Sequence, residues 1–149
     1  MVNNKFNLGI PDQCLANQVA ALLNYNNRLS IVHSGQSITS NLNQYFVEVI
    51  GQTVIGCVGL QIGSKMDKIL HLSVNSLARR NGVGFRLLVT AINNSNKDII
   101  YMTIREDNFM SISLATKLGF KIIAYNPKCN YNVLTLCLFR GKNVTKRAY

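Results

Sequence analysis

At residues 79–84 the chain reads Arg79-Arg80-Asn81-Gly82-Val83-Gly84, between a predicted strand over residues 68–74 and a predicted helix over residues 85–93. Two glycines allow the backbone to turn sharply and to approach a ligand closely. The N–H groups at a helix N-terminus attract anions, and neighbouring arginines add charge-assisted hydrogen bonds. This stretch therefore predicts a loop that binds a diphosphate.

Two well-known types of phosphate-binding loop do not fit this stretch. A Walker loop needs Gly-Lys followed by Ser or Thr, which is missing at this place. A dinucleotide-binding fingerprint needs a third glycine near Leu87 and an acidic partner after the next strand, and neither is in place. The remaining alternative is an ordinary glycine-containing loop with exposed arginines.

The elements on either side of this loop predict a mixed α/β fold, because apolar periodicity switches between strand and helix spacing. Before the loop we expect a strand at 5–9, a helix from 12 to about 26, an ambiguous region at 29–43, a hairpin of strands 44–50 and 53–62, and a strand at 68–74. After it we expect a helix at 85–93, a strand at 99–105, a helix at 109–118, a strand at 120–125, a turn at Asn126-Pro127 and a strand at 131–139.

Composition and charge narrow the possible classes of protein. The 149 residues are 48% hydrophobic and contain no repeats or linkers, which predicts one domain over residues 1–149 with a basic tail at 140–149. The formal charge of +10 favours a polyanionic partner: nucleic acid, an acidic membrane face or a phosphate-bearing cofactor. No apolar run is long enough for a membrane span and the start lacks a signal-peptide core, so we expect a soluble, cytoplasmic protein. The four cysteines show no metal-ligand spacing, so no metal is expected.

Two motifs resemble those of one enzyme family. The pattern Arg79-x-x-Gly82-x-Gly84, after a strand ending in Leu72-Ser73-Val74, resembles the acetyl-CoA signature of the GCN5-related N-acetyltransferases (GNAT). Asn108 opening a helix that ends in Leu118-Gly119-Phe120 is similar to a later motif of that family. The element order agrees over residues 5–139. The resemblance implies a mixed, mostly antiparallel sheet of about six to seven strands flanked by about four helices.

The resemblance also implies roles for individual residues, with acetyl-CoA as the acyl donor and without a metal. Backbone groups around Leu72 and Val74 would pair with the pantetheine arm of the cofactor. Asn108 and Ser111 would line its thiol end. The pyrophosphate would be held by the amides of Arg80, Asn81, Gly82, Val83, Gly84 and Phe85, assisted by the side chains of Arg79 and Arg80.

The usual acid and base residues of the family are missing from this chain. Ala115 aligns with the Tyr that protonates the leaving thiolate in many members, and Thr103 and Lys68 stand where other members have Glu. Two residues are candidates to replace them. His71 has a suitable pKa near neutrality, although strand alternation turns it away from the face of Leu70 and Leu72, as in an ordinary sheet histidine. Tyr101 lies two residues before Thr103 on the same predicted strand, so both side chains point to the same face, and Tyr101 is a candidate acid.

The predicted function is an acetyl-CoA-dependent N-acetyltransferase in which a primary amine attacks the thioester directly. The acceptor is a protein N-terminus, a lysine or a small-molecule amine, and the basic surface favours neutral or acidic acceptors. Ala115 and Thr103 indicate one alternative, a catalytically silent acetyl-CoA-binding or interaction module. The positive charge indicates another, a nucleic-acid-associated protein, which is less favoured because no aromatic residues are interleaved with the basic residues of 140–147. We expect no membrane partner, and a monomer or a homodimer.

Overall fold

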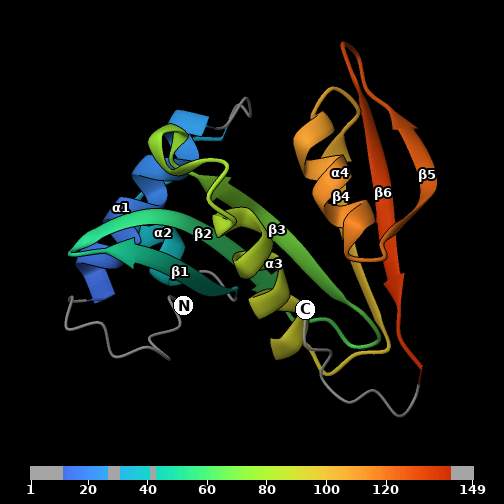
Figure 1. Ribbon diagram of the computed structural model, residues 1–149, viewed down its shortest axis with the longest axis horizontal. Helices are drawn as coiled ribbons and strands as arrows, with labels where there is room; N and C mark the ends of the chain where they lie inside the picture. Colours follow the sequence, from blue (N-terminus) through green and yellow to red (C-terminus); the bar gives the residue numbers. More distant parts are fainter. Residues whose placement is uncertain (1–11, 27–30, 41–42, 142–149) are drawn as a thin grey trace.

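Six strands form one sheet in the order β1-β2-β3-β4-β6-β5 (Figure 1). The structure is a computed structural model and describes residues 12–26, 31–40 and 43–141. The strands are β1 (Gln44–Ile50), β2 (Thr53–Gln61), β3 (Asp67–Val74), β4 (Ile99–Arg105), β5 (Lys121–Pro127) and β6 (Asn132–Phe139). The helices are α1 (Asp12–Asn26), α2 (Gly35–Ser40), α3 (Val83–Asn94) and α4 (Phe109–Lys117), with a 3-10 turn at Ser76–Ala78. All neighbouring strands are antiparallel except β3 and β4, which confirms the predicted mixed, mostly antiparallel sheet with four helices.

The structure corrects several predicted boundaries. The ambiguous region at 29–43 contains the short helix α2, and α3 begins at Val83, two residues before its predicted start. The predicted turn at Asn126-Pro127 is wrong, because β5 continues through Pro127. Proline is tolerated there because β5 is an edge strand, where a missing N–H leaves no further strand unpaired. The chain turns at 128–131 instead. The predicted strand at 5–9 lies outside the described residues.

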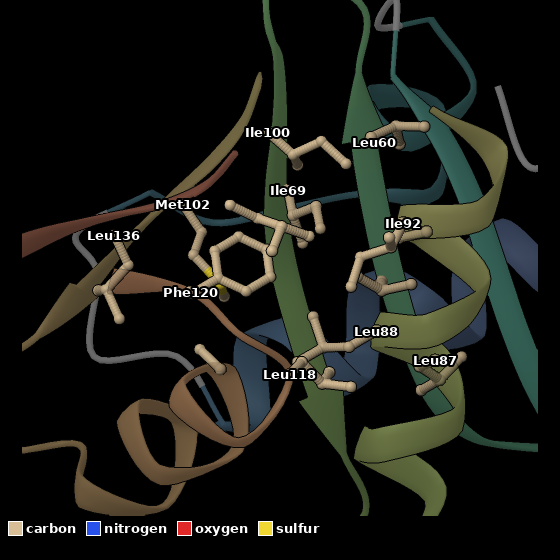
Figure 2. Close-up of a cluster of buried hydrophobic side chains, with 14 of the residues drawn as sticks. Leu60, Ile69, Leu87, Leu88, Ile92, Ile100, Met102, Leu118, Phe120 and Leu136 are labelled. Atoms are coloured by element: carbon tan, nitrogen blue, oxygen red, sulfur yellow. The ribbon is translucent and has the colours of Figure 1, made fainter. Parts of the chain in front are cut away.

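Two clusters of buried side chains cover the two faces of the sheet. On one face, α3 and α4 pack against the strands around Ile69, Leu88, Met102 and Phe120, as Figure 2 shows. On the other face, α1 and α2 cover β1 and β2 through side chains that include Leu15, Val19, Ile38, Tyr45 and Cys57. The predicted helix from 12 to about 26 is confirmed as α1, whose apolar face buries Leu15, Val19, Leu22 and Leu23.

β3 and β4 pair at one end only. Their parallel pairing covers three residue pairs, Asp67–Ile100, Lys68–Tyr101 and Ile69–Met102. Beyond this paired end the two strands continue apart, β3 through residues 70–74 and β4 through residues 103–105, and Figure 1 shows them diverging. We call residues 70–74 and 103–105 the open end. It exposes inner strand edges that carry backbone hydrogen-bonding groups.

A β-bulge in β3 lies at the start of the open end. The pairing of β2 with β3 shifts between Cys57 and Gly59, so that β3 contains one extra residue there. His71, within this extra segment, has a left-handed backbone with φ of 58°. A bulge bends its strand and increases the local twist, which turns β3 away from β4.

A buried carboxylate fixes the paired end. Asp67 is 1% exposed. Its Oδ1 accepts from the Gly63 N–H at 3.0 Å, and its Oδ2 accepts from the Ser95 hydroxyl at 2.6 Å. Asp67 therefore joins the first residue of β3 to the turn before it and to the end of α3.

We expect Asp67→Ala to lower the free energy of unfolding by about 2–3 kcal/mol, because a buried N–H and hydroxyl lose a charged acceptor. The measurement is urea denaturation followed by circular dichroism. Asp98→Ala is the control: Asp98 is exposed, and its replacement should change the value by less than about 0.5 kcal/mol. Equal effects of the two substitutions would contradict the assigned role of Asp67.

Candidate active site

The glycine loop, residues 79–84, has the backbone of an anion-binding turn. Arg80 and Gly82 are both left-handed, with φ of 65° and 76°. Gly82 is the N-cap of α3 and provides no side-chain cap, and the first helical bond runs from the Arg86 N–H to the Gly82 C=O at 3.0 Å. The N–H groups of Val83 and Gly84 therefore precede the first helical hydrogen bond, at the positive end of the helix. Such a turn directs successive N–H groups toward an anion.

The two arginines that begin the glycine loop have different environments. The Nε of Arg79 donates to the Val74 C=O at 3.3 Å, and its Nη2 donates to Asn26 Oδ1 at 3.2 Å. Arg79 thus ties the loop to the end of β3 and to α1. Arg80 is exposed. The side chain of Arg79 is thus engaged in contacts within the fold, whereas no such contact is described for the Arg80 side chain. Of the two predicted phosphate contacts, Arg80 is therefore the more available.

Arg86, one helical turn after Gly82, lies outside both sequence motifs. Its Nη1 donates to the Asn81 C=O at 2.9 Å, and its Nε lies 3.2 Å from both carboxylate oxygens of Glu48 on β1. Its Nη2 forms an ion pair with Glu48 Oε1. The hydrogen bond to Glu48 raises the pKa of Arg86 above its ordinary value. A cavity of about 370 Å³ beside this pair lies between β1 and α3, lined in part by Phe46 and Thr90, and not at the open end.

The backbone of β3 faces the open end at the predicted positions. The Asn75 N–H donates to the Ile55 C=O at 2.8 Å, toward β2. Successive residues of a strand direct their backbone groups to opposite edges, so those of Val74 and Leu72 face the inner edge. The Val74 C=O is already used, since it accepts from Asn26 Nδ2 at 3.0 Å as well as from Arg79. That oxygen is thus less available to a ligand than the sequence predicts.

The second half of α4 contacts the start of α3. A Cβ added to Gly84 would lie 3.2 Å from Leu114 Cδ2 and 3.7 Å from Val74 Cγ2, so glycine allows the two helices to meet here. Asn108 caps α4, with its Oδ1 accepting from the Ser111 N–H at 3.2 Å. The predicted residues of both motifs therefore lie on helix starts that pack on the same face of the sheet.

His71 lies on the opposite face, in a cluster with Tyr45 and His33. The Tyr45 hydroxyl is 2.7 Å from His71 Nδ1, and the rings of His33 and His71 meet edge to face with centroids 4.9 Å apart. Leu72 packs against the α3 side, as alternation predicted. The prediction that His71 and Leu70 lie on opposite faces is wrong. The side chains of Leu70 and Tyr45 both contact the position of an added Cβ at Gly59, and the Tyr45 hydroxyl also contacts His71, so the bulge puts Leu70 and His71 on one face.

A family model described as the acetyltransferase (GNAT) family matches residues 21–120, more than half of the chain. The chain belongs to the GNAT acetyltransferase family. No curated protein sequence matches the chain. The match to the family model confirms the predicted family and the predicted class of enzyme, an acyltransferase.

Solved structures of low sequence identity share the GNAT fold of this chain. The structure of yncA from Salmonella typhimurium with its cofactor acetyl-CoA has a TM-score of 0.75 at 14% identity, covering 94% of this chain and 96% of that one. The ribosomal-protein-S18-alanine N-acetyltransferase from Escherichia coli has a TM-score of 0.69 at 15% identity, covering 87% and 92%. The NatC complex bound to Gag peptide and CoA has a TM-score of 0.72 at 17% identity, covering 90% and 94%.

The pKa of His71 in this GNAT domain differs from the expected near-neutral value. Burial, and then electrostatic interactions with His33 and Lys68, lower it from 6.5 to about 4. The imidazole is therefore neutral at physiological pH. Tyr101 is not beside His71: it pairs with Lys68 at the paired end, where the Lys68 ammonium lies 5.9 Å from its ring centroid. Ala115 is fully buried, and Thr103 is exposed.

The described part of the chain lacks a group of metal ligands and a membrane-spanning helix. Within residues 12–26, 31–40 and 43–141, no three His, Cys, Asp or Glu side chains are grouped so that they can hold a metal ion. All four cysteines are free thiols, and Cys57 and Cys137 are the buried ones. Over the same ranges, no helix is long and apolar enough to cross a membrane.

We expect an NMR titration of the imidazole to give His71 a pKa of about 4, and Lys68→Gln to raise that pKa, because a neighbouring positive charge is removed. Lys121→Gln, on the edge strand β5, is the matched control and should leave the pKa unchanged. A wild-type pKa near 6.5 would show that His71 is solvated in solution.

Proposed function

We propose that this GNAT chain transfers the acetyl group of acetyl-CoA to the nitrogen of a primary amine. The observation that supports this most directly is the juxtaposition of an anion-binding turn with two strands that diverge. The glycine loop follows β3 and leads into α3, so a ligand held by its diphosphate there can extend along the inner edge of β3.

The residues at the open end fit the parts of acetyl-CoA. The amides of residues 80–85 and the Arg80 side chain would hold the diphosphate, the inner edge of β3 at Leu72 and Val74 would hold the pantetheine arm, and Asn108 and Ser111 would border the thiol end. When bound, acetyl-CoA supplies the thioester carbonyl that the amine attacks. The yncA and NatC structures, which hold acetyl-CoA and CoA, support this assignment.

The acceptor amine would enter from the opposite face. The glycine loop and the starts of α3 and α4 occupy the face on which the cofactor is proposed to lie. The His71 cluster, made of Tyr45, His71 and His33, borders the open end on the other face. An amine approaching there reaches the inner edges of β3 and β4 without displacing the cofactor.

We assign the transfer of the amine proton to His71, held in position by Tyr45. With Nδ1–H donating to the Tyr45 oxygen, Nε2 carries the lone pair that accepts the proton. A base with a pKa of about 4 cannot deprotonate a free alkylammonium ion. The amine must therefore enter neutral and lose its proton as the N–C bond forms, when its nitrogen becomes far more acidic. Tyr101 remains the proposed acid for the leaving thiolate, with water as the alternative donor.

The acceptor class, the cytoplasmic location and the oligomeric state stay predictions. The buried Ala115 is the observation that favours the second candidate, a silent acetyl-CoA-binding module, because that position carries no proton donor. Acetylation of a panel of neutral, acidic and basic amines decides between the two candidates. A chain that binds acetyl-CoA and acetylates no amine would be the silent module.

We expect Gly82→Asp to weaken CoA binding at least about 30-fold more than Gly82→Asn, measured by calorimetry. Asp and Asn have the same shape, so both meet the same left-handed backbone and the same steric contact with Arg86 Nη1, which lies 2.9 Å from an added Cβ. Only Asp adds a negative charge where the diphosphate is proposed to lie. The expected 30-fold difference corresponds to about 2 kcal/mol of binding free energy. Equal affinity of both variants would contradict the diphosphate assignment.

We expect kcat/KM to rise with pH through the pKa of the acceptor amine, without an inflection near 6.5. His71→Gln should lower kcat by about 10²-fold with an unchanged KM for acetyl-CoA, which is the range for loss of a proton-transfer group. Tyr45→Phe should give a smaller loss, and Tyr101→Phe tests the proposed acid. If all three variants keep the wild-type kcat, these side chains do not transfer the proton, and water does.

A further inference from the structure

Arg86 connects the glycine loop to the edge strand β1. Its guanidinium has three sets of partners: the Asn81 C=O through Nη1, both Glu48 oxygens through Nε, and Glu48 Oε1 through Nη2. Glu48 lies on β1, which packs against α3 (Figure 1). The contact therefore couples a strand at the sheet edge to the backbone at the middle of the loop.

The contact determines which backbone groups of the loop can meet an anion. An oxygen facing a diphosphate would repel it, and Arg86 holds the Asn81 C=O by a 2.9 Å hydrogen bond on the side of α3. The guanidinium lies close beneath Gly82, since an added Cβ would be 2.9 Å from Nη1. With that carbonyl held back, the N–H groups of Val83 and Gly84 are the groups left to face a ligand.

Glu48 fixes the plane of the guanidinium. A carboxylate that receives two N–H donors of an arginine constrains it as a fork, which a single charge contact does not. The side chains of Arg86 and Glu48 are 54% and 27% exposed, so this pair contributes little to stability. Positioning, and not folding energy, is then the effect by which the pair can matter.

We infer that Glu48 and Arg86 are positioning residues that hold the glycine loop in its diphosphate-binding conformation. The inference rests on the proposed acetyl-CoA function. Arg86 does not itself contact the diphosphate: its charge is neutralised by Glu48, and one of its donors is directed to the loop backbone. Breaking either half of the pair releases the Asn81 carbonyl and weakens the recognition of the diphosphate, while the pantetheine portion is bound as before.

The test compares CoA with pantetheine, which lacks the diphosphate and the nucleotide. Calorimetry gives the dissociation constants of both for the full chain, and their ratio measures the contribution of the phosphate-bearing part. Glu48→Asp keeps the charge but shortens the side chain by one methylene, and Arg86→Lys keeps the charge but loses the fork. The control, Asp98→Glu, makes the reverse change, the addition of one methylene, at an exposed carboxylate.

We expect Glu48→Asp and Arg86→Lys each to weaken CoA binding by about tenfold, which is about 1.4 kcal/mol, with pantetheine binding unchanged. The double variant should be no weaker than the weaker single variant, because both act through one contact. Asp98→Glu should match the wild type. Thermal unfolding of each variant checks that the fold is retained.

The other outcomes overturn the inference. Unchanged or tighter CoA binding by Glu48→Asp together with loss in Arg86→Lys would show that Arg86 binds the diphosphate directly. Equal weakening of CoA and pantetheine would show a general structural effect. If both variants keep the wild-type ratio of the dissociation constants for CoA and pantetheine, the pair has no role in binding the diphosphate. A wild-type chain that binds CoA no better than pantetheine would instead contradict the proposed function.

Discussion

The partial pairing of β3 with β4 is the constraint on which the rest of the structure depends. Two parallel neighbours that pair over three residues and then separate leave backbone groups without strand partners in the middle of a sheet. The left-handed bulge at His71 bends β3 away, and the buried Asp67 keeps the other end closed. Unpaired backbone inside a folded domain is costly unless water or a ligand pairs with it, so this arrangement favours an extended ligand.

The cations available to a ligand at this site are determined by contacts within the fold and not by the net charge of the chain. The formal charge of +10 does not distinguish among polyanions, and the described structure uses several cations internally. Arg79 holds β3 and α1 together, Arg86 is neutralised by Glu48, and Arg105 pairs with Asp107 at 3.2 Å. The proposed anion site then depends on backbone N–H groups at the start of α3 and on Arg80, which suits a specific diphosphate.

The His71 cluster illustrates how a fold changes the chemistry of a residue. A solvated histidine titrates near neutrality, whereas burial beside His33 and Lys68 lowers the pKa of His71 to about 4. The proposed enzyme thus relies on alignment of a neutral amine with the donor and needs only a weak base. This is consistent with a family member that lacks the usual tyrosine, since Ala115 packs in the core.

Periodicity, caps and short motifs are local properties of a chain, and they predict α1, the helices and strands after residue 43, the mixed sheet, the family and the glycine loop. The sequence alone did not determine that Pro127 remains in a strand, that Leu70 and His71 share a face, or that the Val74 carbonyl is occupied. Nor did it reveal the link from Arg86 to Glu48. These four features exist only in the folded chain, because each depends on strand register, on a bulge or on contacts between residues far apart in the sequence.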